Sequence, residues 1–374
     1  MSLPVTASNH PARWWAPLPD GRIECQLCPR LCKLNDGQRG FCFVRQRVGD
    51  EMLLTTYGRS SGFCVDPIEK KPLNHFLPGT PILSFGTAGC NLGCRFCQNW
   101  NISKAREFDK LADEASPETI ASVAGRLACR SVAFTYNDPV IFAEYAIDVA
   151  KACHAHGIKT VAVTAGYIMP EPRREFYAHM DAANVDLKGF TQEFYHRQCF
   201  AELDEVLETL VYLKRETQVW FEVTTLLIPG ANDSAEEIDR ASDWFAQNLG
   251  PDVPWHFTAF HPDFKMLDRP PTPPETLHRA RRLAQQMGLK YVYEGNIHSD
   301  GGNTICPGCK QVVITRSWHS VMSNQLKNGC CANCGTRIVG VFAKGEAAKR
   351  RAWAEENPSH RRHEGNQDPR LRSV

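Results

Sequence analysis

The sequence predicts an α/β protein whose core is a mostly parallel sheet, either barrel-like or doubly wound. Short β-branched runs recur between Ile82 and Tyr293, and segments with helix start signals separate them. The chain has 374 residues, of which 43% are hydrophobic, so it holds enough apolar material for a sizeable core. Six or seven alternating strand and helix units of this kind are typical of a parallel sheet covered by helices.

The expected strands follow one another at regular intervals. They are residues 82–85, 131–135, 160–164, 183–187, 219–224, 255–260 and 290–293. Helix starts between them carry a capping residue, a proline in the first turn, or both. These starts are Ser116-Pro117, Asp138-Pro139, Asp233-Ser234 and Pro274-Glu275. Glycines 157 and 288 mark expected helix ends.

Composition divides the chain into four parts. Residues 1–80 are rich in Cys, Gly and Pro and form a small N-terminal segment whose own core is thin. Residues 81–298 hold the strand and helix units. Residues 299–342 form a second Cys-rich module, with short strands expected over 311–315 and 337–342. Residues 343–374 are charged and nearly free of aliphatic side chains, which predicts a disordered tail.

Charge and hydropathy exclude several classes of protein. Lys and Arg number 43 and Asp and Glu number 42, so the formal net charge of +1 argues against a nucleic-acid partner. No uncharged apolar run approaches the roughly 18 residues that a membrane span needs. The first residues also lack the basic and apolar regions of a signal peptide. We therefore expect a cytoplasmic protein without a membrane partner.

The sixteen cysteines are the unusual feature of the composition. A reducing cytoplasm gives no use for so many thiols unless some bind metal. Twelve fall into three groups: Cys25, Cys28, Cys32 and Cys42; Cys90, Cys94 and Cys97; and Cys306, Cys309, Cys330, Cys331 and Cys334. The four single cysteines, which are Cys64, Cys129, Cys153 and Cys199, are expected to be buried structural thiols.

The central group follows the first expected strand directly. Cys90, Cys94 and Cys97 lie in a glycine-flanked loop, where three thiolates can bind three irons of a cubane cluster and leave the fourth iron open. A structural zinc site would need a fourth ligand, and neither Cys nor His follows nearby in this loop. In barrel folds the loops after the strands carry the chemistry. The pattern therefore predicts a catalytic iron–sulfur cluster.

This loop resembles the signature of the radical S-adenosylmethionine superfamily, Cys-x3-Cys-x-aromatic-Cys, with Phe96 at the aromatic position. Longer runs, among them CQLCPRLC, VDPIEKKPLNHFLPG and EGNIHSDGGNTICPGC, resemble its AmmeMemoRadiSam-system branch, which is related to pyruvate formate-lyase activating enzyme. The resemblance implies a partial (β/α)6-type TIM-like barrel. It also implies a [4Fe-4S] cluster that binds S-adenosylmethionine and cleaves it reductively to a 5'-deoxyadenosyl radical for hydrogen abstraction.

The resemblance further implies partners and cofactor contacts. Reduced flavodoxin or ferredoxin would donate the electron, and the unknown substrate could be a protein glycine. Asn137 and Asp138 match the strand-end motif that receives the methionyl amino group. Thr164 occupies the place of a Thr-Asn-Gly turn, and the backbone of Phe96 would lie near the adenine.

A second set of strand-end residues is a candidate for catalysis. Asp186 and Lys188 look like the Asp-Leu-Lys strand end of glycyl-radical activating enzymes. His256 and His261 flank the end of the sixth expected strand, where a side chain faces either the core or the site. Glu222 interrupts an apolar strand, which predicts a buried carboxylate that points into the barrel, needs a partner and contributes to the cofactor site.

The two flanking cysteine groups suggest further metal sites. Two Cys-x2-Cys knuckles have a spacing typical of zinc ribbons, with an auxiliary Fe-S cluster as the alternative: Cys306, Cys309, Cys331 and Cys334. The N-terminal group offers four thiols that suit zinc or an accessory cluster equally: Cys25, Cys28, Cys32 and Cys42. A competing function, a non-catalytic zinc-binding interaction module, rests on these two groups.

Overall fold

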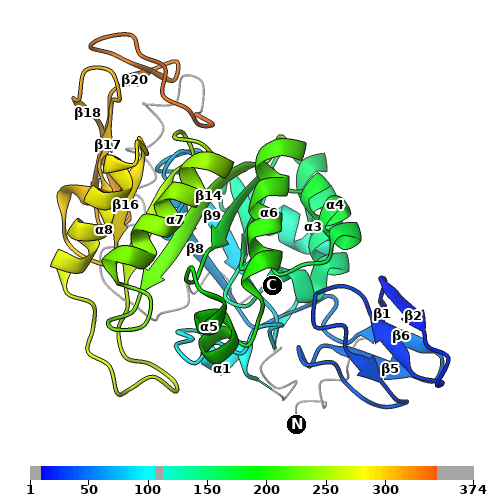
Figure 1. Ribbon diagram of the computed structural model, residues 1–374. Helices are drawn as coiled ribbons and strands as arrows, with labels where there is room; N and C mark the ends of the chain where they lie inside the picture. Colours follow the sequence, from blue (N-terminus) through cyan, green and yellow to red (C-terminus); the bar gives the residue numbers. More distant parts are fainter. Residues whose placement is uncertain (1–9, 106–112, 343–374) are drawn as a thin grey trace.

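A computed structural model describes residues 10–105 and 113–342 of the chain (Figure 1). Its centre is an eight-stranded sheet with the order β16-β15-β14-β13-β12-β11-β9-β8. Seven neighbouring strands of this sheet are parallel: β9 (Pro81–Phe85), β11 (Ser131–Phe134), β12 (Lys159–Thr164), β13 (Ala182–Asp186), β14 (Trp220–Leu227), β15 (Trp255–Ala259) and β16 (Val292–Gly295). The predicted parallel sheet is confirmed, with every expected strand in place.

Helices cover the outer face of this sheet (Figure 1). The crossover helices are α2 (Pro117–Arg126), α3 (Ala143–Ala155), α4 (Pro170–Ala178), α6 (Leu203–Glu216), α7 (Ala235–Asn248) and α8 (Pro274–Gln286). The edge strand β8 (Phe63–Pro67) pairs antiparallel with β9, and among the described strands β8 and β16 do not pair with each other. Six strand–helix units and a seventh strand thus form an open barrel, which confirms the predicted partial barrel.

Local sequence signals explain where the helices begin and end. The Ser116 hydroxyl accepts a hydrogen bond from the amide of Thr119 at 3.2 Å, and Ser234 caps α7 by accepting from the amide of Glu237 at 3.1 Å. Gly157 follows α3 with φ of +69°, a conformation that glycine adopts without steric cost. The expected caps are therefore confirmed at these helices.

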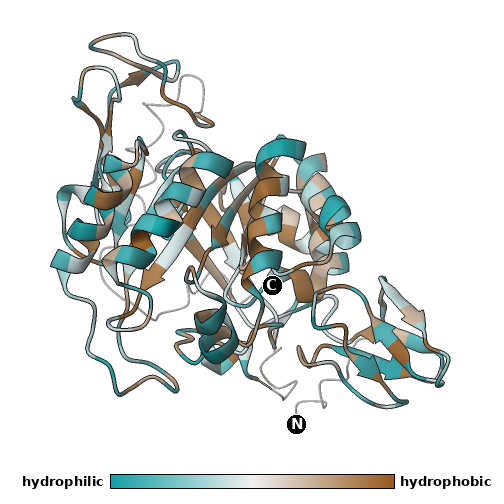
Figure 2. Ribbon diagram, in the orientation of Figure 1, coloured by the Kyte–Doolittle hydropathy of each residue, from teal (hydrophilic) through white to brown (hydrophobic). Residues whose placement is uncertain are grey.

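The two faces of the sheet bury different side chains. The outward-facing residues pack against the apolar sides of the helices, which Figure 2 shows in brown. On the inner face, one apolar cluster fills the end of the barrel from which the strands start: Ile68, Leu73, Phe76, Leu77, Ile82, Ala133, Val161 and Ala182. Because this cluster seals the N-terminal ends of the strands, polar chemistry is left to their C-terminal ends.

The N-terminal segment consists of short strands beside the barrel. They are β1 (His10–Pro11), β2 (Trp15–Pro17), β3 (Ile23–Cys25), β4 (Lys33–Leu34), β5 (Arg45–Val48), β6 (Glu51–Leu54) and β7 (Arg59–Ser60), the last of which pairs with β10 (Asp113–Glu114). A buried ion pair links the segment to α3, with Arg45 Nη1 3.0 Å from Glu144 Oε1. The segment that we expected to span residues 1–80 also supplies β8 to the main sheet.

Breaking this ion pair should destabilise the protein. The side chains of Arg45 and Glu144 are only 1% and 3% exposed, so Glu144→Gln leaves a buried guanidinium without its counter-charge. We expect a loss of about 3–5 kcal/mol in the free energy of unfolding, measured by denaturant titration. Asp252→Asn is the control, because it breaks a half-exposed pair with Lys290 and should change stability by under ~1 kcal/mol. Equal losses of unfolding free energy in the two variants would contradict a special contribution of the buried Arg45–Glu144 pair to stability.

The C-terminal module packs on the β16 edge of the barrel. Its strands are β17 (Thr304–Ile305), β18 (Val312–Ser317), β19 (Ser320–Asn324), β20 (Leu326–Lys327) and β21 (Cys330–Cys331). β18 confirms the strand expected at 311–315. The strand expected at 337–342 is wrong, because this stretch forms only single bridges, one of them from Val341 to Phe76. The backbone of Val341 instead bonds to His75 and Leu77 beneath the barrel.

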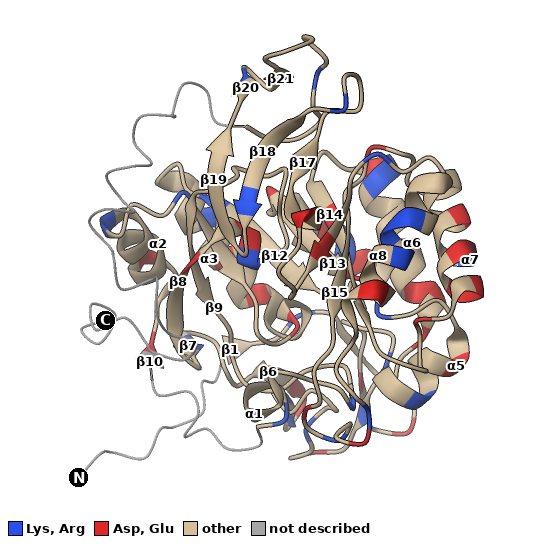
Figure 3. Cartoon of the chain, turned by 90° about the vertical axis from the view of Figure 1, so that its left-hand side faces the viewer, with Lys and Arg blue, Asp and Glu red and all other residues tan. Residues whose placement is uncertain are grey.

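Short helices and surface charge complete the description. The short helices are η1 (Ile68–Lys70), α1 (Trp100–Ser103), η3 (Pro139–Phe142), α5 (Gln192–Phe194), the π-helix η4 (Tyr195–Cys199) and η5 (Asp300–Gly302). Figure 3 shows charged residues of both signs over the molecule, with acidic residues along α7. In the described part of the chain, no helix combines the length and the apolar character that crossing a bilayer requires. The tail expected at 343–374 lies outside the described residues.

Candidate active site

The cysteine loop joins β9 to α1 and is held by backbone and amide hydrogen bonds. The Oδ1 of Asn137 accepts from the amide of Thr87 at 3.1 Å, and its Nδ2 donates to the carbonyl of Gly89 at 2.9 Å. A Cβ at Gly86 would lie 2.3 Å from the carbonyl oxygen of Thr135, so only glycine fits there. Asn137, which follows the neighbouring strand β11, thereby holds the start of the cysteine loop in place.

The far side of the loop rests on the π-helix η4. The amide of Gly93 donates to the carbonyl of Cys199 at 2.8 Å, and the amide of Arg95 donates to the carbonyl of Gln198 at 2.9 Å. π-helical turns occur mostly at functional sites. Because these bonds hold η4 against the loop, the thiol of Cys199 lies beside Cys94. The sequence analysis expected Cys199 to be a structural thiol and did not predict this contact.

The three thiols of the loop have different environments. Burial raises the pKa of Cys90 to about 12, with the charge of Asp138 adding to the effect. Burial also raises the pKa of Cys97, whose sulfur lies 3.1 Å from the hydroxyl of Ser103. A hydrogen bond from Cys199 lowers the pKa of Cys94 to about 6. Buried thiols of this kind bind as thiolates when a metal replaces the proton, so the set suits metal coordination.

Asp138 and Thr164 lock the ends of β11 and β12 together. The Oδ1 of Asp138 accepts from the Thr164 hydroxyl at 2.8 Å and from the amide of Val140 at 3.1 Å, while its Oδ2 accepts from the amide of Ala165 at 2.9 Å. Burial raises the pKa of Asp138, and these donors oppose the rise. The carboxylate is thus largely occupied by the protein itself.

Asp186 and Lys188 form an ion pair at the end of β13. The Nζ of Lys188 lies 2.9 Å from the Oδ2 of Asp186, and the Asp186 side chain stays 34% exposed. Burial opposes the charged lysine, but Asp186 and the thiols of Cys94 and Cys199 raise the pKa of Lys188 well above its usual value. The pair therefore faces the cysteine loop, as the strand-end pattern predicts.

Phe96 and His261 are two further residues that the sequence analysis predicted for the site. Phe96 is buried against Phe194, with ring centroids 5.8 Å apart. His261 is exposed on the loop after β15 and makes only a 3.4 Å contact with the carbonyl of Pro262. The structure therefore does not bring His261 to the strand-end cluster, because β15 ends two residues earlier.

Glu222 is buried and points inward, as predicted, and its partner is His256 at 2.7 Å. The same carboxylate also accepts from the amides of Asn74 and His75 and from the indole of Trp220. Both oxygens are therefore used near the start of the strand. These four donors occupy the carboxylate in the structure, so its partners are protein groups, and the cofactor contact expected of Glu222 stays a prediction.

Several residues of the barrel interior were not singled out by the sequence analysis. Tyr136 holds a φ of +70°, which is rare for an aromatic residue and marks strain beside Asn137. The Nζ of buried Lys71 lies 2.8 Å from Asp66 Oδ2 and 5.1 Å from the Tyr136 ring centroid. Cys64 lies on the same strand as Asp66, with its sulfur 3.4 Å from Asp66 Oδ1, and is half-buried rather than buried as the sequence analysis expected. Asp66 and Lys71 belong to the run 65–79 that carries the family resemblance, but the local sequence does not show that they lie near Tyr136.

The C-terminal cysteines converge on one point. The sulfurs of Cys306 and Cys334 are 3.6 Å apart and those of Cys309 and Cys331 are 3.7 Å apart. All four lie within 4.8 Å of one another, and no other group of three or more Cys, His, Asp or Glu within the described residues is this compact. Thiolates about 2.3 Å from one tetrahedral zinc would be roughly 3.8 Å apart, so the set fits a single ion.

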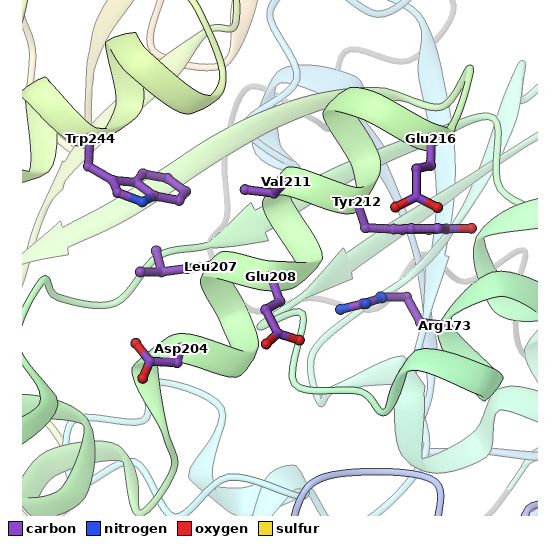
Figure 4. A pocket seen from close by; sticks show the side chains of 8 residues that line it. All are labelled: Arg173, Asp204, Leu207, Glu208, Val211, Tyr212, Glu216 and Trp244. Carbon is purple, nitrogen blue, oxygen red and sulfur yellow. The ribbon is translucent and has the colours of Figure 1, made fainter.

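Two of the hollows in the described part of the chain lie outside the cysteine loop and differ in position. A cavity of about 60 Å³ separates the ends of β15 and β16 from the turn between β18 and β19, with Thr258, Glu294, Arg316 and His319 on its walls. A shallower one lies on the outer helices and is lined by Arg173, Tyr212 and acidic residues of α6 (Figure 4). The first opens beside the barrel interior, whereas the second lies away from the strand ends.

Comparison with known proteins places this geometry in a family. Residues 85–241 match the family described as the Radical SAM superfamily. An uncharacterized protein of Methanocaldococcus jannaschii is 38% identical over 330 residues, which cover 87% of this chain and 98% of that one. The chain belongs to the radical SAM superfamily. The matched region begins at the last residue of β9 and includes the whole cysteine loop, so the recognised family and the site coincide.

Other relatives of this radical SAM protein have named activities. Pyruvate formate-lyase 1-activating enzyme of Escherichia coli K12 is 22% identical over 240 residues, covering 58% of this chain and 93% of the enzyme. The 4-hydroxyphenylacetate decarboxylase activating enzyme of Clostridioides difficile is also 22% identical, over 59% of this chain and 71% of its own. Among solved structures, a radical SAM methyltransferase from Sphaerobacter thermophilus aligns over 77% of this chain and 78% of its own, with 14% identity and a TM-score of 0.47.

Proposed function

We propose that this radical SAM protein cleaves S-adenosylmethionine reductively and uses the product radical to abstract hydrogen from a substrate. The observation that carries the proposal is the convergence of the Cys90, Cys94 and Cys97 loop with Asp186 and Lys188 at the ends of parallel strands. Three cysteines would hold a [4Fe-4S] cluster, which when bound supplies one electron to break the bond between sulfur and the 5' carbon of S-adenosylmethionine.

The residues around the loop divide into positioning and binding groups. Asn137 holds the loop backbone, and Asp138 with Thr164 holds two strand ends, so these three position the site. Asp186 keeps unused acceptor sites and partial exposure, which suit the methionyl ammonium group. Lys188 beside it would bind the methionyl carboxylate and offset the charge of the thiolates.

Substitution of the three ligands tests this function. In the chain with Cys90→Ala, Cys94→Ala and Cys97→Ala, we expect no 5'-deoxyadenosine above background after anaerobic reconstitution and addition of dithionite and S-adenosylmethionine. The matched control is Cys129→Ala, since Cys129 is buried away from the loop and should not affect cleavage. Formation of 5'-deoxyadenosine by the triple variant at the wild-type rate would contradict the proposal.

The substrate and the electron donor belong to the same proposal. The activating enzymes among the relatives support a protein glycine as the hydrogen donor, and a small molecule is the alternative. Reduced flavodoxin or ferredoxin would supply the electron. Sixteen cysteines without a disulfide in the described part of the chain suit a reducing compartment, so we place the reaction in the cytoplasm.

Label transfer separates the two substrate classes. We would add S-adenosylmethionine deuterated at its 5' carbon to a cell extract with the reconstituted enzyme. If a protein glycine is the substrate, a glycyl radical signal appears in a protein fraction by electron paramagnetic resonance. Label found only in a metabolite fraction would exclude a protein glycine as the substrate but would still support hydrogen abstraction by the radical.

The C-terminal set supports a second proposal, that of a bound zinc ion. Its four sulfurs have the separations of a closed tetrahedral site, which gives structure rather than catalysis. The competing function, a zinc-binding module without catalysis, accounts for this set but not for the strand-end cluster. An absorbance band in the visible range from an anaerobically purified sample would count against a protein that binds only zinc and has no catalytic function, because zinc sites are colourless.

A further inference from the structure

The four N-terminal cysteines converge on one side of the barrel. A Cβ built on Gly40 would lie 3.7 Å from the sulfurs of both Cys32 and Cys42, and the amide of Phe41 donates to the sulfur of Cys32 at 3.5 Å. The amide of Cys25 donates to the carbonyl of Cys32 at 2.9 Å, and Cys25 and Cys42 are buried while Cys28 and Cys32 are half-buried. These contacts and the short spacing along the chain bring the four thiols together as one ligand set.

The spacing of this set differs from that of the C-terminal set. The C-terminal sulfurs lie within 4.8 Å of one another and suit one ion. Although residues 25–42 are fully described, no three of the N-terminal sulfurs meet that limit, and neither do those of Cys90, Cys94 and Cys97. Thiolates on a cubane bind different irons and so lie farther apart than thiolates on one ion. Neither the N-terminal set nor the catalytic set therefore has the compact arrangement that suits one ion.

The N-terminal set is packed directly onto the catalytic loop. Gly89 has φ of +80°, and a Cβ there would lie 2.0 Å from the carbonyl oxygen of Cys42. Since Gly89 precedes Cys90, one backbone contact and one residue separate the two ligand sets. Arg30, which lies between Cys28 and Cys32, donates to the carbonyl oxygens of Asn91 within the cysteine loop and of Phe200, which follows η4.

Charge around the N-terminal set also suits a group that gains and loses electrons. Buried Arg45 acts electrostatically on Cys25 and Cys42 while it pairs with Glu144. Hydrogen bonds to the sulfurs and nearby charge are the means by which a protein sets the potential of a cluster. A guanidinium held between the thiols and a carboxylate offsets part of the negative charge that four thiolates bring.

We propose that Cys25, Cys28, Cys32 and Cys42 bind an iron–sulfur cluster that passes electrons to the catalytic cluster. The proposal rests on the proposed function of the central loop. One electron from a low-potential carrier of the flavodoxin or ferredoxin class reduces the N-terminal cluster by one charge. The same electron then moves to the catalytic cluster and returns the first to its oxidised state. No bond is made or broken, and no proton is transferred in this step.

Metal content tests the N-terminal site independently of catalysis. In the chain with Cys90, Cys94 and Cys97 changed to Ala, anaerobic reconstitution with iron and sulfide should leave about four irons and four sulfides per chain. Adding Cys28→Ser and Cys32→Ser should remove this iron, while zinc at the C-terminal set persists and reports a folded chain. Two zinc ions per chain and no iron in the triple variant would overturn the proposal.

Electron delivery tests the role of the site in the chain with all three central cysteines. For Cys28→Ser/Cys32→Ser, we expect the rate of 5'-deoxyadenosine release with reduced flavodoxin, relative to the rate with dithionite, to fall at least about tenfold. The signal of the catalytic cluster in electron paramagnetic resonance shows that this site is loaded. An unchanged ratio would overturn the relay. Absence of cleavage in wild-type protein with dithionite would instead count against the function of the central loop.

Discussion

Lys188→Met is expected to lower the rate of S-adenosylmethionine cleavage by roughly 10²–10³-fold, the loss seen when one preorganised charged donor is removed from an active site. Lys188 is paired with Asp186 at 2.9 Å and lies in the field of Cys94, so its charge is part of the site before any ligand binds. Methionine keeps the length and apolar stem of the side chain but not its charge. The measurement is single-turnover formation of 5'-deoxyadenosine after reduction with dithionite.

The control for this variant lies at the opposite end of the same sheet. Lys159 begins β12 and pairs with Asp181 at 2.6 Å, but this pair lies where the strands start. Lys159→Met should leave cleavage within about twofold of the wild type, since surface pairs contribute little. If Lys188→Met retained its iron and cleaved at the wild-type rate, Lys188 would not bind the reacting groups.

The sequence predicted those parts of the fold that depend on neighbours along the chain. A strand was expected at 131–135 and the structure has Ser131–Phe134, because a β-branched run flanked by polar turns is a local signal. The cysteine loop was predicted in the same way, from spacing and from its place after a strand. That place also put Asp186 and Lys188 at the same edge of the sheet, since parallel strands end together.

Contacts between distant segments could not be read from the sequence. Nothing in the pattern shows that β8 turns back to pair antiparallel with β9, or that η4 brings Cys199 to Cys94. Cys199 is buried, as expected of a single cysteine, yet its neighbour is a ligand of the site. Side chains of this kind acquire their roles from tertiary packing, which local periodicity does not encode.

The inner strand residues show the same division. Alternation predicted that Glu222 points into the barrel and needs a partner, and His256 is that partner. Two further donors to the carboxylate are the amides of Asn74 and His75, which belong to the run 65–79 that carries the family resemblance but shows no periodicity. The sequence therefore indicated the inward direction of Glu222 but not its other hydrogen-bond donors, which come from distant segments.

Removal of the C-terminal metal should have the largest effect on stability. The module has a small apolar core that includes buried Cys306 and Cys331, so the zinc ion that we propose there would supply much of its folding energy. We expect Cys309→Ser to abolish zinc binding, to open the chain after residue 300 to limited proteolysis, and to lower the melting temperature. Tyr291 and Tyr293 share this core, so the β16 edge of the barrel should loosen as well.

Cys330→Ser is the matched control. Cys330 adjoins Cys331 in β21 but lies outside the compact set, so this variant should keep one zinc ion and resist proteolysis. Full protease resistance in metal-free Cys309→Ser would mean that packing alone holds the module.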